Sequence, residues 1–166
     1  MKTKLLVLLL LLMTACTTNK PMTDEQIAAV KEEGSSVVKE FFDALVKSDL
    51  ERMTNMLENS PDYNFIVGGD VYNYDRMVEM ANQYIPMVER QTFDTKFEQY
   101  VIVSPECFIY TWHGKNGMIM KTGEEIMMED YLLTYCFRKH DEGWKLFTGH
   151  ESEKVPIPID TTAVPI

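Results

Sequence analysis

Basic residues are in short supply in this chain. Lysine and arginine together number 16 against 26 aspartates and glutamates, and the formal net charge is −10. No basic cluster interrupts this excess, and a chain this acidic repels the phosphate backbone of nucleic acids. The same charge disfavours electrostatic docking on anionic lipid. We therefore expect no nucleic-acid partner, and attachment to a membrane has to come from another source.

Short catalytic and cofactor-binding motifs are also missing. The sequence contains no Gly-x-Gly-x-x-Gly, no P-loop, no Gly-x-Ser-x-Gly and no His-Glu-x-x-His pattern. Its three histidines, His113, His140 and His150, are dispersed and not set at the spacing of metal ligands. The sequence therefore predicts neither a metal site nor a cofactor.

Cysteine is rare, with three residues in the chain. Cys16 follows the N-terminal apolar run, whereas Cys107 and Cys136 fall on two different predicted strands. In an exported protein these two could be oxidised to a disulfide. Two small, buried, reduced side chains are the alternative. The spacing leaves both open and excludes a zinc knuckle.

Only one long apolar run occurs, and it lies at the N-terminus. Lys2 and Lys4 precede the apolar residues 5–13, and Thr14-Ala15-Cys16 follows. A positive start, an apolar stretch and small residues form the layout of a secretory signal. The ending Met-Thr-Ala-Cys resembles the lipobox of bacterial lipoproteins, in which cleavage precedes a cysteine that is then acylated. An uncleaved anchor is the alternative, but the run is shorter than the roughly 20 residues that a spanning helix needs.

This interpretation divides the chain into four parts. After removal of the signal, roughly 150 residues remain, which suffices for one domain with a real core. A lipid on Cys16 would anchor the protein to a membrane of the bacterial cell envelope without spanning it. The expected segments are a signal peptide (1–15), a tether (16–22), one folded domain (23–154) and an extended, proline-containing tail (155–166).

Helices are expected first along the domain and strands last. Capping boxes at residues 23–26 and 48–51, and a cap at Asn73, predict the starts of three amphipathic helices. A short β-prone segment, Tyr63 to Val67, lies between the second and third helices. From Gln91 the apolar period changes from 3.6 to about two. Four strands are expected, at residues 92–103, 106–120, 125–139 and 143–152, and they make the fold α+β.

This order of elements resembles the nuclear-transport-factor-2-like superfamily, in particular its SnoaL-like branch. The residues that carry the resemblance are the first-helix segment 37–45, the Phe137–Leu146 segment with its charged turn and Gly143-Trp144-Lys145, and His150-Glu151-Ser152. The resemblance implies a cone: three N-terminal helices packed on a strongly curved, mostly antiparallel sheet, with a pocket at the open end. It also implies frequent dimers, here a homodimer through the sheet face. The branch includes enzymes and pure binding domains, so the fold does not settle the function.

Three residues are candidates for proton transfer. Alternation from Trp144 puts Leu146, Thr148, His150 and Ser152 on one strand face, and an imidazole on the concave face would suit a general base. Glu129 and Asp130 are adjacent, so alternation lets one of them point inward and act as an acid or a base. The alternatives are a buried, hydrogen-bonded histidine and exposed strand carboxylates.

Aromatic residues supply candidates for ligand binding. Such side chains combine a large apolar area with a polar tip, as ligand pockets do, but cores and dimer faces contain them too. The 12 methionines add adaptable apolar side chains. The candidates are Tyr72, Tyr84, Tyr110, Trp112 and Tyr131.

Three functions follow from these candidates. The first is a lipid-anchored domain that binds a small apolar or aromatic molecule without turnover. The second is a cyclase, isomerase or dehydratase that uses His150 with Glu129 or Asp130. The third is an assembly domain in which side chains fill the pocket.

Overall fold

The computed structural model describes residues 21–154, so the expected signal peptide, the lipid on Cys16 and the extended tail lie outside the described residues. Its helices are α2 (Asp24–Val46), α3 (Leu50–Asn55), α4 (Tyr74–Tyr84) and the 3₁₀ turn η2 (Ile85–Met87). The capping box that starts α2 forms as expected, with Thr23 accepting from the Gln26 amide. The second helix is capped by Asp49, one residue later than the sequence pattern indicated. None of the described helices is long and apolar enough to cross a membrane.

The strands form one six-stranded sheet in the order β2-β1-β6-β5-β4-β3. All neighbouring strands are antiparallel except β1 and β6, which run parallel. The bounds are β1 (Asn64–Val67), β2 (Asp70–Tyr72), β3 (Val88–Ser104), β4 (Cys107–Met120), β5 (Glu125–His140) and β6 (Gly143–Glu153). The expected α+β fold with a mostly antiparallel sheet is confirmed, and the short strand β2 is an addition to it.

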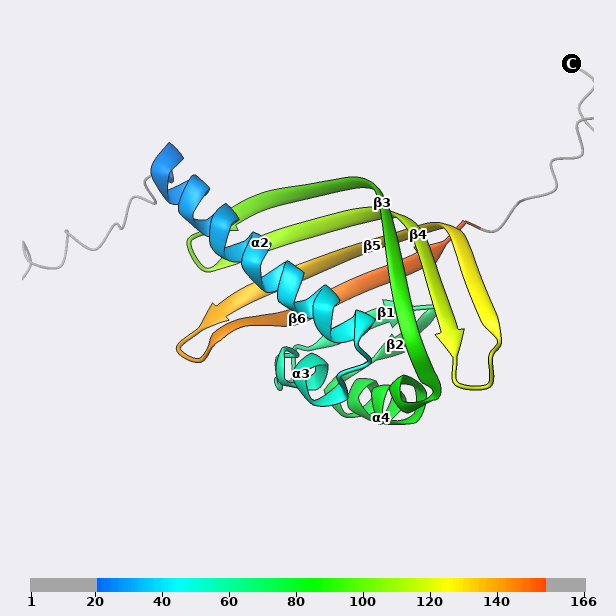
Figure 1. Ribbon diagram of the computed structural model, residues 1–166. Helices are drawn as coiled ribbons and strands as arrows, with labels where there is room; N and C mark the ends of the chain where they lie inside the picture. The colour runs from blue at the N-terminus through cyan, green and yellow to red at the C-terminus, as the bar shows by residue number, and fades with distance from the viewer. Residues whose placement is uncertain (1–20, 155–166) are drawn as a thin grey trace, which may run out of the picture.

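The long strands bend, and the helices lie inside the bend (Figure 1). Helix α2 crosses the concave face of the sheet, while α3 and α4 lie near one end of it. Gly34 lets α2 come close to the sheet, because a Cβ there would lie 3.1 Å from the Phe108 ring. Phe108 in turn stacks on Phe137 with 4.9 Å between ring centroids. This aromatic core holds the helix layer on the sheet and leaves the space beside α4 open.

The outer face of the sheet carries several exposed apolar side chains. They are Phe97, Val101, Val103 and Leu132, which are between 39% and 57% exposed. Such a face suits pairing with a second copy, and the expected homodimer stays a prediction. Cys107 and Cys136 are free, half-buried thiols on the neighbouring strands β4 and β5. Burial raises the pKa of both thiols, which keeps them in the less reactive form.

Candidate functional site

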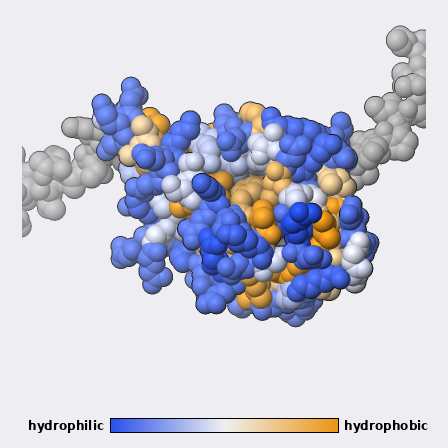
Figure 2. All heavy atoms as spheres, viewed as in Figure 1, coloured by the Kyte–Doolittle hydropathy of each residue, from blue (hydrophilic) through white to orange (hydrophobic). Residues whose placement is uncertain are grey.

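A cavity of about 790 Å³ lies between the sheet and the helices α2, α3 and α4. This volume is within the range of small-molecule binding sites. On the side of the molecule shown in Figure 2, apolar side chains gather near the middle and hydrophilic ones surround them. Most of the lining is apolar, with methionines, aromatic rings and a leucine from α2, α3, α4 and the sheet: Phe41, Met53, Phe65, Met77, Met80, Tyr84, Phe93, Met118, Met128 and Leu133.

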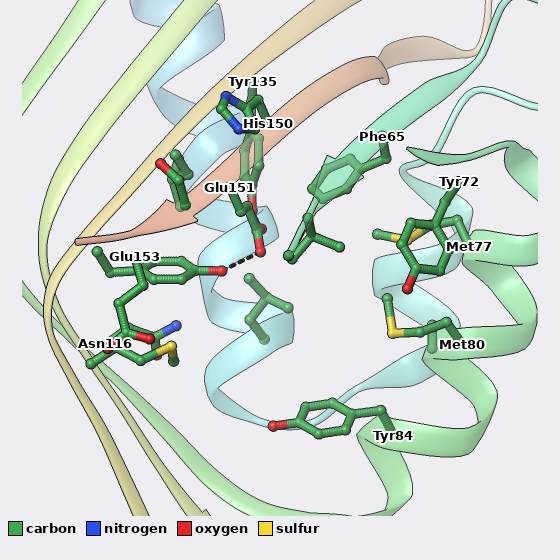
Figure 3. A pocket seen from close by; sticks show the side chains of 18 of the residues that line it. Phe65, Tyr72, Met77, Met80, Tyr84, Asn116, Tyr135, His150, Glu151 and Glu153 are labelled. Atoms are coloured by element: carbon green, nitrogen blue, oxygen red, sulfur yellow. Dashed lines mark hydrogen bonds between the residues drawn. The ribbon is translucent and has the colours of Figure 1, made fainter. Parts of the chain in front are cut away.

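Glu151 on β6 provides the most unusual polar group of this lining. Its carboxyl accepts hydrogen bonds from the hydroxyls of Tyr131 and Tyr135 on the neighbouring strand β5. Burial raises the pKa of Glu151 above its ordinary value, although the two tyrosine hydrogen bonds act in the opposite direction. Figure 3 shows this carboxyl facing the cavity, with Tyr72, Met77 and Met80 on the far side. The arrangement holds one acidic group inside an otherwise mostly apolar space.

A third tyrosine hydroxyl belongs to the same neighbourhood. The Tyr63 hydroxyl is buried and has no hydrogen-bond partner within the described part of the chain. Burial, followed by the nearby charge of Glu151, raises the pKa of Tyr63 well above its usual value, so the phenol stays protonated. A buried hydroxyl without a partner is uncommon and costs free energy unless another group pairs with it. Tyr63 is not among the residues that line the cavity, so its hydroxyl lies behind the wall that carries Glu151.

The side chain of His150 lies on the opposite face of β6 from the Glu151 carboxyl. Phe137 pairs with Leu146 but Cys136 pairs with Thr148, so Phe147 is an extra residue in β6. The bulge reverses the alternation, and the prediction that His150 shares a face with Leu146 is wrong. Glu151 instead lies opposite the buried Leu133. His150 borders the cavity, but it is exposed and its ring points away from the Glu151 carboxyl (Figure 3).

Glu129 and Asp130 both lie outside the cavity, and a second bulge explains this. Gly114 pairs with Tyr131 and Asn116 with Met128, so two residues of β5 lie opposite Lys115 alone. The Lys115 Nζ lies 2.7 Å from a Glu129 oxygen, and the Lys96 Nζ lies 2.8 Å from the Asp130 Oδ1. The expectation that one of the two carboxylates points inward is therefore wrong.

The aromatic candidates divide between the cavity and the core. Tyr72, Tyr84 and Tyr131 line the cavity, and the Tyr84 hydroxyl lies 2.9 Å from the Met118 sulfur. Tyr110 and Trp112 are buried outside this lining. The Tyr110 hydroxyl donates to Glu98 (3.1 Å), and the Trp112 Nε1 donates to the Thr95 hydroxyl (2.7 Å). The Tyr110 hydroxyl and the Trp112 indole N–H thus have hydrogen-bond partners within the sheet.

Sequence reasoning missed Glu151 and Tyr135 as members of the site. Glu151 stands inside the His-Glu-Ser segment that carries the family resemblance, but the alternation rule placed it on the outer face. The signal that was available is an acidic residue within the last predicted strand, inside the segment that carries the family resemblance. Without the position of the bulge, that signal does not say which side the carboxyl faces.

A buried carboxyl, that of Glu58, lies away from the cavity and is paired with basic side chains. Glu58 accepts from Arg138 (3.2 Å) and lies 2.9 Å from the His140 Nε2. Burial raises the pKa of Glu58, but the contacts with His140 and Arg138 outweigh it and leave the pKa below its ordinary value. No group of three or more histidine, cysteine or acidic side chains in residues 21–154 could hold a metal ion.

Comparison with known proteins places the chain among domains of this shape. The family model described as a SnoaL-like domain matches residues 35–158. No curated protein matches the chain.

Several solved structures share the fold at low sequence identity. A nuclear-transport-factor-2-like protein from Salmonella enterica is 12% identical with a TM-score of 0.68, and the alignment covers 81% of this chain and 98% of that one. A hexachlorocyclohexane dehydrochlorinase, LinA-type3, from Novosphingobium barchaimii is 12% identical with a TM-score of 0.63, covering 84% and 96%. An NTF2-like protein from Rhodospirillum rubrum is 17% identical with a TM-score of 0.60, covering 73% and 98%.

Proposed function

Because the chain belongs to the family of SnoaL-like domains, we propose that it binds a small, largely apolar molecule in its cavity. The observation that carries this proposal is a cavity of about 790 Å³ with mainly apolar walls and the half-buried, tyrosine-bonded carboxyl of Glu151. Apolar walls supply affinity, and a few placed polar groups orient a ligand. A pocket filled by side chains, which the assembly function would need, does not match this volume.

Replacing Met80 with tryptophan is expected to weaken ligand binding at least about tenfold, because the larger side chain occupies space that the ligand needs. Met80 lines the cavity from α4 and points into it (Figure 3). The measurement is a fluorescence titration with the neutral apolar fluorophore N-phenyl-1-naphthylamine. Met87→Trp is the matched control, since Met87 is 49% exposed and outside the lining. Unchanged binding by Met80→Trp, with normal folding, would place the fluorophore elsewhere and contradict the proposal.

Acid–base catalysis is the second candidate function, with Glu151 in the role first assigned to His150. Burial raises the pKa of Glu151, and a raised pKa is what a carboxyl needs to act as a general acid or base. The fold relative named as a dehydrochlorinase carries out an elimination, which is chemistry of this type. Compounds recovered from the titrations separate the two functions. Binding alone returns them unaltered, whereas catalysis alters them with the wild type and not with Glu151→Gln.

We also propose that the domain is held on a membrane of the bacterial cell envelope by a lipid on Cys16. The support is the order of Lys2, Lys4, the apolar residues 5–13 and Thr14-Ala15-Cys16. Cys16→Ser is expected to move most of the protein from the membrane fraction to the soluble or unprocessed fraction, because the acylated thiol is lost. Immunoblots of cell fractions and the mass of the N-terminal peptide measure this. A membrane-bound Cys16→Ser protein of processed size would contradict the proposed anchor.

A further inference from the structure

The charged groups that border the cavity are almost all acidic. Asp70, Glu151 and Glu153 lie in the lining, which contains no lysine and no arginine among its described residues. We infer that the preferred ligand is an amphipathic amine, a molecule with a cationic nitrogen on a mostly apolar body. This inference rests on the proposed binding function and names the chemical class of the ligand.

Glu151 is suited to receive the cationic nitrogen. A carboxylate has about four lone-pair positions, and the hydroxyls of Tyr131 and Tyr135 use two of them. An ammonium group has N–H donors that fit the remaining positions. A desolvated carboxylate is costly when it is unpaired, and a cation beside it removes much of this cost. An anionic ligand group at the same position would instead be repelled.

The walls around the carboxyl favour a cation as well. The rings of Phe65 and Tyr135 lie with 5.7 Å between their centroids, and both residues line the cavity. Aromatic faces attract ammonium groups, and they do so more strongly where water is excluded. The two aromatic rings therefore favour a cation beside Glu151 and carry no formal charge themselves.

The surroundings of the cavity point the same way. Glu153 and Asp70 are exposed lining residues, and the chain as a whole carries a net charge of −10. Such a field attracts cations and repels anions. Arg76, whose guanidinium lies 4.9 Å from the centroid of the Tyr72 ring, donates to the Val71 carbonyl and is outside the lining. His150 is the one basic side chain among the described lining residues, and it is exposed with its ring turned away from the Glu151 carboxyl. A carboxylate ligand therefore finds no lysine or arginine within the lining.

Three probes with one naphthyl body test the inference: 2-(2-naphthyl)ethylamine, 2-(2-naphthyl)ethanol and 2-naphthylacetic acid. Isothermal titration calorimetry near neutral pH gives their affinities for the full domain. We expect the amine to bind about tenfold more tightly than the alcohol, and the acid to bind most weakly. Glu151→Gln is expected to lower the affinity for the amine to that for the alcohol. Glu124→Gln, in the exposed turn between β4 and β5, is the matched control and is expected to retain the wild-type order.

Proton release provides a second readout that does not depend on the variant folding. Binding of a cation favours the ionised form of Glu151, so across the pH range in which Glu151 titrates the wild type is expected to release more protons when it binds the amine than when it binds the alcohol. Calorimetry in phosphate and in Tris, which differ in ionisation enthalpy, measures this release. Equal affinity for all three probes, tighter binding of the acid, or an amine preference that survives Glu151→Gln would overturn the inference while the binding function stands. Failure of both the fluorophore and the naphthyl probes to bind would instead overturn the proposed function itself.

Discussion

Gly114→Ala is expected to destabilise the folded domain by about 3 kcal/mol, the largest single-methyl effect that we predict. A Cβ at this position would lie 2.1 Å from the backbone oxygen of Asp94 and 2.7 Å from the Trp112 ring. Neither neighbour can move easily, since Asp94 belongs to the paired strand β3 and Trp112 is buried with its Nε1 bonded to Thr95. Urea unfolding followed by circular dichroism measures the change.

Gly117→Ala on the same strand is the matched control. A Cβ there would meet the Thr92 hydroxyl at 2.7 Å and the Met127 methyl at 2.9 Å, which are ends of side chains that can rotate away. We expect a change within about 1 kcal/mol. A Gly114→Ala protein as stable as Gly117→Ala would contradict the close approach of β3 and β4. That approach lies at the bend of the sheet and places Asn116 and Met118 in the cavity lining.

The second large effect is on the pH dependence of stability. Burial raises the pKa of Glu151 above its ordinary value of 4.5, so the folded protein holds this proton more tightly than the unfolded chain. The contribution of Glu151 to stability is therefore full below that value and is lost as the pH rises through the folded pKa. We expect Glu151→Gln to match the wild type at low pH and to exceed it by about 1–3 kcal/mol at mildly alkaline pH. Thermal or urea unfolding across this range measures the difference.

Glu58→Gln is the control for this pH series, because the pKa of Glu58 is shifted in the opposite direction to that of Glu151. Contacts with His140 and Arg138 outweigh burial and keep the pKa of Glu58 below its ordinary value, so its contribution is present above the unfolded pKa and is lost as the pH falls. We expect Glu58→Gln to be less stable than the wild type near neutral pH and to approach it in acid. A constant difference between Glu151→Gln and the wild type at every pH would contradict the raised pKa of Glu151.

Local signals predicted most of the fold. The capping residues Thr23 and Asn73 act as the sequence indicated, and the turn at Thr122-Gly123 separates β4 from β5. Gly123 has φ +86°, a backbone conformation that glycine adopts without strain. These features depend on residues a few positions apart, so they can be read without knowing the tertiary structure. The parallel contact of β1 with β6 joins residues some 80 positions apart, and no local pattern indicates it.

The sequence predicted the type of site, but not all of the residues that form it. The sequence indicated a cone with an aromatic, methionine-rich pocket, and Tyr72, Tyr84 and Tyr131 do line the cavity. Alternation along a strand, however, holds only while every residue is paired. One extra residue at Phe147 exchanged the faces of His150 and Glu151, and the bulge at Glu129 and Asp130 placed both carboxylates outside.

The class of the fold, the order of the elements and the acidic, apolar-rich character of the domain can all be read from the sequence. Those properties follow from composition, capping and periodicity, which are local. The meeting of Glu151, Tyr131 and Tyr135 inside the cone depends instead on contacts between two strands, β5 and β6. Bulge positions depend on how β6 pairs with β5 and how the sheet bends around α2, and such long-range contacts have no counterpart in neighbouring residues.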